Sequence, residues 1–223
     1  NILDFSNILN LISYRLVIFL ESVLWVKLFK SKSYFSLGLF EKNNNIITEL
    51  RKADIIHIHW SIGIISLLTL RKIKKPIVWT IRDMWTFTGG CHYTVNCPEN
   101  WFLRILSYFL CKFKEIIFRK AKNITFVGIS NWITKEALNS KILNGKKIKT
   151  IYNITDKENF KILSKEAARD ELNLPKNKFI ILFGSININQ DAHKGGKIIK
   201  EVLQHFEKDS DIFFISFGSN IYP

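Results

Sequence analysis

Short runs of β-branched and aromatic residues alternate with longer amphipathic segments along most of this chain. Residues 54–60, 76–81 and 123–129 form three such runs, each rich in Ile, Val, Thr or aromatic residues. Runs of this kind are typical of strands, and residues 62–73 between the first two have the pattern of a helix. Strand, helix and strand in this order predict a βαβ unit, whose second strand is parallel to the first and buried on both faces. The alternation therefore predicts an α/β fold with an open parallel sheet.

The same alternation continues toward the carboxyl end. We expect further helices at residues 101–119, from 131 onward, at 165–172 and at 196–206, and further strands at 148–152, 179–183 and 211–217. Ser130 is the expected N-cap of the helix that begins near Asn131, because a Ser side chain can accept from a backbone N–H of the first turn. A change of composition after Asn153 places a first domain at residues 1–155, a linker at 156–176 and a second domain at 177–223.

The apolar stretch at residues 9–29 raises the question of a membrane span. Arg15, Glu21 and Lys27 interrupt it at helical intervals, whereas a span needs about 20 largely uncharged residues. We therefore expect an amphipathic helix, and the lack of a small-residue cleavage site after it argues against a signal peptide.

The chain is strongly basic, with 33 Lys and Arg against 19 Asp and Glu and a net charge of +14. Such a charge is compatible with nucleic acid, an anionic membrane surface or a phosphorylated substrate. The basic residues are spread along nearly every segment, which disfavours a nucleic-acid partner. One concentration lies on or near the apolar helix expected at residues 101–119 and indicates contact with an anionic membrane surface. It comprises Arg104, Lys112, Lys114, Arg119, Lys120 and Lys122.

The Cys and His residues allow a metal site without demanding one. With three Cys the chain has no disulfide framework, so a reducing cytosol is the expected compartment. Cys91, His92 and Cys97, with Cys111 as an optional fourth, are the best candidate metal ligands, but their spacing matches no common site. Thiols that are free or paired remain the alternative. His57 and His59 share one face of a strand and are better explained as packed or pocket-lining residues. We expect no metal.

Candidate functional residues follow the ends of the predicted strands, where ligands bind in open parallel sheets. His59 and Trp60 follow the first strand, and residues 82–93 follow the second. In this second loop Asp83 and His92 can bind hydroxyls or move a proton, whereas a plain surface loop with a capping Asp is the alternative.

Flat and flexible residues complete that loop. Trp85 and Tyr93 offer flat faces for a sugar or a base, and Gly89 and Gly90 would let the backbone approach a ligand closely.

A third loop, in the predicted second domain, has the residue types of an anion site. Gly184 and Ser185 follow a strand, and Lys194 precedes a helix, so backbone N–H groups and an ammonium could meet a phosphate. The loop matches neither the dinucleotide-binding nor the Walker A sequence.

Several of these strings together resemble one enzyme family. They are residues 34–40 (Tyr-Phe-Ser-Leu-Gly-Leu-Phe), residues 54–60, the string Trp-Thr-Ile-Arg-Asp-Met-Trp-Thr-Phe-Thr-Gly-Gly-Cys-His-Tyr of residues 79–93, residues 128–132, and Phe183-Gly-Ser with His193-Lys-Gly. The sequence resembles the family 4 retaining glycosyltransferases, and within them the bacterial enzymes of colanic-acid and other surface-polysaccharide assembly. The resemblance covers nearly the whole chain.

The resemblance implies a GT-B fold, in which two Rossmann-like domains hold an acceptor and a nucleotide-sugar donor. Transfer in this family retains the anomeric configuration and needs no metal or other cofactor. By this likeness Lys194 contacts the donor diphosphate above Gly184 and Ser185, and Arg82 and Asp83 lie at the reaction centre. The acceptor side would be lined by His59, Trp60, Trp85, Gly89, Gly90 and His92. The acceptor would be a glycan or a lipid-linked sugar, and a lipid-linked acceptor would place this cytoplasmic enzyme at the inner face of the cell membrane.

The chain departs from the family at several points. Arg82 stands where most relatives carry a histidine, and Ser185 where many relatives of the wider family carry an arginine. An Arg cannot act as a base near neutral pH. Neither the start of the first domain nor the acidic donor motif of the second is found, so we expect a fragment that is inactive by itself. The alternatives are an inactive remnant and a basic α/β module that binds nucleic acid or membranes.

Overall fold

The computed structural model describes residues 34–41, 46–94, 97, 98, 100–185 and 194–218, together with Arg15, Leu16 and Phe19. Most of the helix expected at residues 9–29 lies outside these ranges. The chain divides into two compact units, Asn1–Ile154 and Thr155–Pro223.

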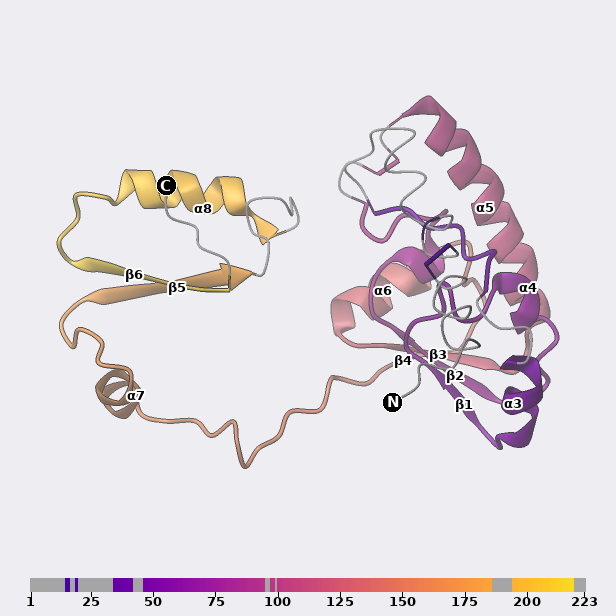
Figure 1. Ribbon diagram of the computed structural model, residues 1–223, viewed down its shortest axis with the longest axis horizontal. Coiled ribbons are helices and arrows are strands. Elements are labelled where there is room, and N and C mark those ends of the chain that lie inside the picture. The colour runs from indigo at the N-terminus through magenta and orange to yellow at the C-terminus, as the bar shows by residue number, and fades with distance from the viewer. Residues whose placement is uncertain are drawn as a thin grey trace, which may run out of the picture. The chain divides into compact units, whose positions relative to one another are not determined.

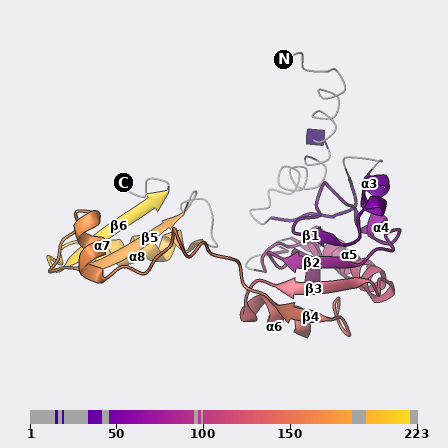
Figure 2. The same ribbon diagram turned by 90° about the horizontal axis from the view of Figure 1, so that it is seen from below.

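The first unit is built on a parallel sheet. Its described strands are β1 (Ile56–Ile58), β2 (Ile77–Ile81), β3 (Ile124–Gly128) and β4 (Ile148–Thr150), in the spatial order β1-β2-β3-β4 (Figure 2). Every neighbouring pair is parallel. The predicted α/β class and the parallel βαβ unit are thus confirmed. Because all four strands run in one direction, the residues that follow them gather at one edge of the sheet.

The described helices of this unit are α3 (Ile46–Lys52), α4 (Leu67–Leu70), α5 (Trp101–Lys120) and α6 (Asn131–Asn139). The predicted cap of α6 is confirmed, since the Ser130 side chain accepts from the Ile133 N–H. The helix expected at residues 62–73 is much shorter than predicted. Gly63 adopts a left-handed φ of 72°, and the Ser66 side chain caps α4 by accepting from the Thr69 N–H, so the helix begins only at Leu67.

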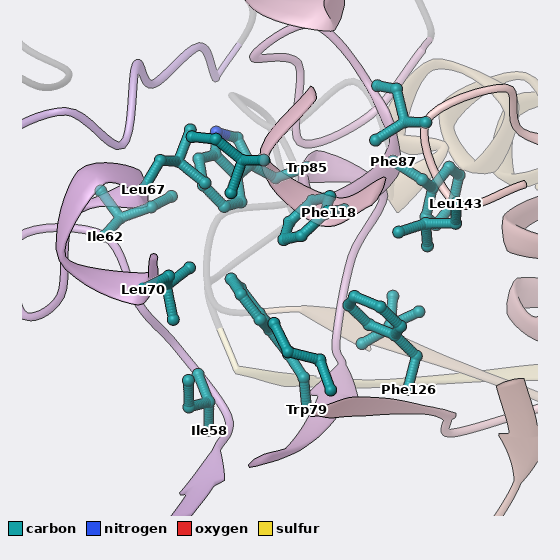
Figure 3. Packing of buried hydrophobic residues seen from close by; sticks show 14 of the residues in the cluster. Ile58, Ile62, Leu67, Leu70, Trp79, Trp85, Phe87, Phe118, Phe126 and Leu143 are labelled. Atoms are coloured by element: carbon teal, nitrogen blue, oxygen red, sulfur yellow. The ribbon is translucent and has the colours of Figure 1, made fainter. Parts of the chain in front are cut away.

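Aromatic side chains form the centre of the core between the sheet and α5 (Figure 3). The Phe118 ring meets Trp79 and Phe126 edge-on, at centroid distances of 5.7 and 5.4 Å. Phe118 and Phe126 are fully buried. The carboxyl end of α5 is therefore fixed to the sheet by interlocked rings.

Within the part of the chain that the structure describes, no helix is both long enough and apolar enough to cross a membrane. α5 reaches 20 residues, but Arg104, Lys112 and Glu115 interrupt its apolar surface. Its start is capped by Asn100, whose side chain accepts from the Leu103 N–H at 2.9 Å.

The second unit contains α7 (Lys165–Glu171), β5 (Phe179–Ser185), α8 (Gly196–His205) and β6 (Ile212–Gly218) (Figure 1). β5 and β6 pair in parallel, with α8 between them in the sequence. Phe183 is the buried centre, and Phe214 and Ile199 pack against it. The buried Arg169 of α7 donates to the carbonyls of the turn before β5, those of Pro175, Lys176 and Lys178.

Two phenylalanines of α5 provide a matched test of the core. Replacing the buried Phe118 with Ala should lower the free energy of unfolding by about 3–5 kcal/mol, since a cavity opens beside Trp79. Phe109→Ala on the exposed side of the same helix should change it by less than about 0.5 kcal/mol. Urea unfolding followed by circular dichroism measures both, and equal losses would contradict this packing.

Candidate functional site

Arg82, just after β2, joins the residues that follow two other strands. Its guanidinium donates to Nδ1 of His59, after β1, at 3.1 Å. It also donates to Oδ1 of Asn153, after β4, at 2.8 Å. All three residues are exposed. The parallel sheet therefore assembles a small polar cluster, here called the Arg82 cluster, from Arg82, His59 and Asn153.

The Arg82 cluster fixes the protonation of its histidine. A guanidinium can only donate, so Nδ1 of His59 must be unprotonated and its Nε2 carries the proton. Desolvation lowers the pKa of His59, with the neighbouring His57 and the charge of Arg82 as further causes. The His57 ring lies 4.1 Å from that of His59 and bonds Thr80 at 2.8 Å. The two histidines share a face, as predicted, and the cluster offers a ligand one fixed cation and one imidazole N–H donor.

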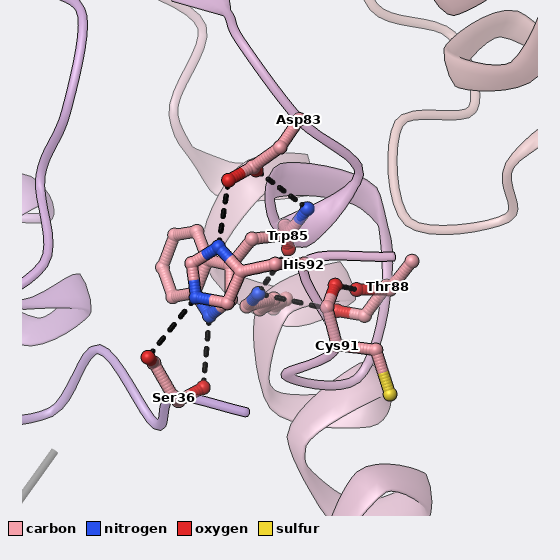
Figure 4. A network of polar contacts seen from close by, with 7 residues as sticks. Ser36, Asp83, Trp85, Thr88, Cys91 and His92 are labelled. Atoms are coloured by element: carbon pink, nitrogen blue, oxygen red, sulfur yellow. Dashed lines mark hydrogen bonds and ion pairs between the residues drawn. The ribbon is translucent and has the colours of Figure 1, made fainter. Parts of the chain in front are cut away.

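Behind this cluster, Asp83, His92 and Ser36 form a chain of hydrogen bonds (Figure 4). The Asp83 carboxylate bonds Nδ1 of His92 at 2.6 Å, and Nε2 of His92 bonds the Ser36 hydroxyl at 3.0 Å. The other Asp83 oxygen accepts from the Trp85 backbone N–H at 2.9 Å. Both carboxylate oxygens are thus occupied within the protein.

Asp83, His92 and Ser36 are linked in the same order as the Asp, His and Ser of a serine hydrolase triad. Unlike the serine of such a triad, however, Ser36 is not accessible to a substrate. Ser36 and His92 are 3% and 5% exposed, so a substrate carbonyl has no route to the hydroxyl. The His92 ring also stacks on Trp60 and on Trp85. The chain therefore holds residues 34–36 against residues 90–92, which also pair through backbone hydrogen bonds.

A buried lysine fixes the turn that carries Trp85, the short 3-10 helix η2 (Trp85–Phe87). The Lys114 ammonium from α5 donates to the carbonyls of Trp85 and Thr88 and lies 3.3 Å from the centre of the Trp85 ring. Lys114 is fully buried. The prediction that Lys114 belongs to a membrane-facing basic group is therefore wrong, because its ammonium binds two carbonyls and an aromatic ring inside the core.

Four of the residues expected on the acceptor side are buried. Trp85 and His92 are buried, and Trp85 also donates from its indole N–H to the Ser36 carbonyl. A side chain at Gly89 would collide with Ser107 of α5, and one at Gly90 with the ring of Phe35. These glycines therefore allow α5 and residues 34–36 of the protein itself to approach the loop closely. The sequence had predicted that a ligand would make this approach.

Two of the three cysteines are paired with each other. Cys91 and Cys97 form a disulfide, with their Cα atoms 5.9 Å apart, which differs from the expectation of reduced thiols and removes both from the candidate metal ligands. Cys111 is a free thiol whose pKa is raised by burial. Among the described residues, no group of three His, Cys, Asp or Glu side chains could hold a metal ion.

The surface over this region is only slightly hollowed. The hollow has a volume of about 10 Å³, close to the space of a single water molecule. Its lining includes His59, Trp60, Arg82, Asp83 and Trp85. Trp60 is 48% exposed at the mouth. A ligand as large as a sugar would lie across this mouth, against Trp60 and the Arg82 cluster.

The predicted anion loop of the second unit is described in part. β5 ends at Ser185, and the backbone of Gly184 lies so close to the Phe217 carbonyl that a side chain there would collide with it. Lys194 is exposed, and Gly195, with a left-handed φ of 70°, is the N-cap of α8. His193 lies outside the described residues. Lys194 therefore stands directly before a helix N-terminus, a position that suits an anion.

Comparison of the chain with models of protein families and with curated proteins gave no match.

The roles of three residues of this region were not predicted from the sequence. Asn153 could have been found, because it follows a predicted strand just as His59 and Arg82 do. Ser36 and Lys114 carry no such signal, since a hydroxyl and an ammonium in a basic chain are usually solvated. Their partners lie 56 and 29 residues away, so only the folded chain identifies them.

The electrostatics of the Arg82 cluster can be tested by NMR titration of the imidazole signals. The pKa of His59 should lie below its ordinary value, and Arg82→Gln should raise it only in part, because desolvation and His57 remain. Arg71→Gln, at an exposed Arg outside the cluster, should leave it unchanged. Since the folded-state pKa is lowered, this group's contribution to stability is full above the unfolded pKa and is lost as pH falls. A His59 that titrates normally would contradict the geometry.

The buried ammonium can be tested with two lysines of one helix. Lys114→Met should lower the free energy of unfolding by about 3 kcal/mol, since two carbonyls lose a charged donor. Lys112→Met removes an exposed lysine paired with Glu115 at 3.5 Å and should cost less than about 1 kcal/mol. Urea titration monitored by tryptophan fluorescence compares them, and a Lys114 variant as stable as the Lys112 variant would refute the assignment.

Proposed function

We propose that this protein is a glycosyltransferase of the GT-B type, which transfers a sugar from a nucleotide-sugar to a glycan or lipid-linked acceptor with retention. The observation that carries the proposal is the Arg82 cluster beyond the carboxyl ends of β1, β2 and β4. Ligands of open parallel sheets bind at this edge. The resemblance of residues 79–93 to family 4 glycosyltransferases supplies the reaction class.

On the acceptor side, we assign substrate binding to the side chains that are exposed. Trp60 offers a flat apolar face, Nε2 of His59 donates to a hydroxyl, and Arg82 binds a hydroxyl or a phosphate oxygen. Arg82 itself cannot remove a proton near neutral pH.

The buried residues of the same loop are assigned a supporting role. Asp83, His92 and Trp85 hold one another and Ser36 through short hydrogen bonds. They fix the position of the backbone from which Arg82 projects. Gly89 and Gly90 allow α5 and residues 34–36 to approach that backbone. Catalytic groups need such a packed support to stay in place.

On the donor side, we assign the diphosphate to the start of α8. The ten residues Gly196–His205 form a regular helix whose first N–H groups are unpaired within it, and Lys194 adds a positive charge beside them. The βαβ order of β5, α8 and β6 is the arrangement in which nucleotide phosphates are bound at a helix N-terminus.

Binding of nucleoside diphosphates tests this assignment. We expect UDP, GDP or ADP to bind the full 223-residue chain in calorimetric titrations, and Lys194→Gln to weaken the binding by roughly tenfold or more, the value of a charge-assisted hydrogen bond. Lys208→Gln, at an exposed lysine beyond the end of α8, is the matched control and should have no effect. Absence of binding for all three nucleotides, or equal affinity of the two variants, would overturn the donor assignment.

A further inference from the structure

The outward face of α5 carries large apolar side chains that the core does not cover. Trp101 is 72% exposed, Tyr108 60% and Phe109 63%. Ile105 and Ile116 are also exposed. The spacing of these five residues places them on one side of the helix, and Figure 1 shows α5 along the flank of the first unit. We call this set the outer face of α5.

Basic side chains accompany the outer face. Arg104, Lys112, Arg119 and Lys120 are exposed on the same helix, whose single acidic residue is Glu115. Beside the carboxyl end of α5 lies a cavity of about 430 Å³ whose lining contains four cations and no acid. These cations are Arg71, Lys74, Lys120 and Lys122.

The combination of residues favours one kind of partner. Lysines are depleted from the centres of protein interfaces, yet Lys112 lies in the middle of the outer face. Bases of a nucleic acid stack on aromatic rings but not on Ile105 and Ile116. At a bilayer surface, aromatic and branched side chains enter the headgroup layer while Lys and Arg meet lipid phosphates. An anionic surface therefore satisfies both the apolar and the charged residues.

We propose that the outer face of α5, with the basic cavity at its carboxyl end, is a docking surface for an anionic lipid bilayer. The helix lies along the membrane without crossing it: its inner side, with Leu103, Leu110 and Phe118, stays packed in the core. The proposal concerns membrane binding alone and does not depend on the glycosyltransferase activity proposed above.

Vesicle sedimentation of the full chain tests the charge component. The protein should pellet with vesicles of phosphatidylcholine mixed with phosphatidylglycerol and far less with phosphatidylcholine alone, and added salt should release it. Arg104→Gln with Arg119→Gln should weaken binding by roughly fivefold per cation. The control pair Lys135→Gln with Lys141→Gln removes the same charge from exposed positions on and just after α6, and should have little effect.

Exposed side chains also test the apolar component. Tyr108→Gln with Phe109→Gln should weaken vesicle binding by roughly tenfold or more, whereas Leu138→Gln, an exposed residue of α6, should not. Circular dichroism checks that the variants keep the fold. The proposal is overturned if the face variants bind like their controls, if neutral and anionic vesicles pellet the protein equally, or if the double variant converts a dimer to a monomer and leaves vesicle binding unchanged.

Discussion

The buried ammonium of Lys114 is the interaction on which the first unit depends. It joins α5 to the turn after β2 through two backbone carbonyls and the face of the Trp85 ring. A charge in an apolar interior is costly unless polar groups surround it. The turn must therefore adopt the conformation that directs its carbonyls toward α5. That conformation in turn sets the direction in which the loop leaves the sheet.

The consequences of this anchor reach the candidate site. Lys114 holds Trp85 in place, so that its backbone N–H donates to Asp83 and its indole N–H donates to the carbonyl of Ser36. Hydrogen bonds from Asp83 to His92 and from His92 to Ser36 complete this network. Two layers result. The inner layer is buried and stabilises the loop, and the outer layer, with Arg82, His59 and Trp60, is exposed to a ligand. In the sequence this loop is a single dense polar motif. Burial divides it into residues that support the loop and residues that can contact a ligand.

The same division applies to the positive charge of the chain. Lys114 and Arg169 are buried and donate hydrogen bonds to backbone carbonyls, so they are structural cations. Others gather at the carboxyl end of α5, where four line one cavity without an acid. Burial lowers the pKa of Lys146 nearby, and Lys122 lowers it further, as expected where cations crowd together. The positive charge is therefore divided between buried structural cations and a local concentration at the carboxyl end of α5.

The sequence by itself determined the α/β class, the parallel sheet, the strand and helix order and the Ser130 cap, because these follow from local periodicity and from hydrogen bonds between near neighbours. It also located Arg82 and His59, since residues after parallel strands meet at one edge. The sequence predicted too long a helix for α4, because the left-handed Gly63 and the Ser66 cap delay its start to Leu67. Only the tertiary structure decided that Lys114, His92, Gly89 and Gly90 face the protein interior and that Cys91 pairs with Cys97. Burial depends on which distant segments meet, and the partners of Gly90 and His92 at residues 35 and 36 lie more than 50 positions away along the chain.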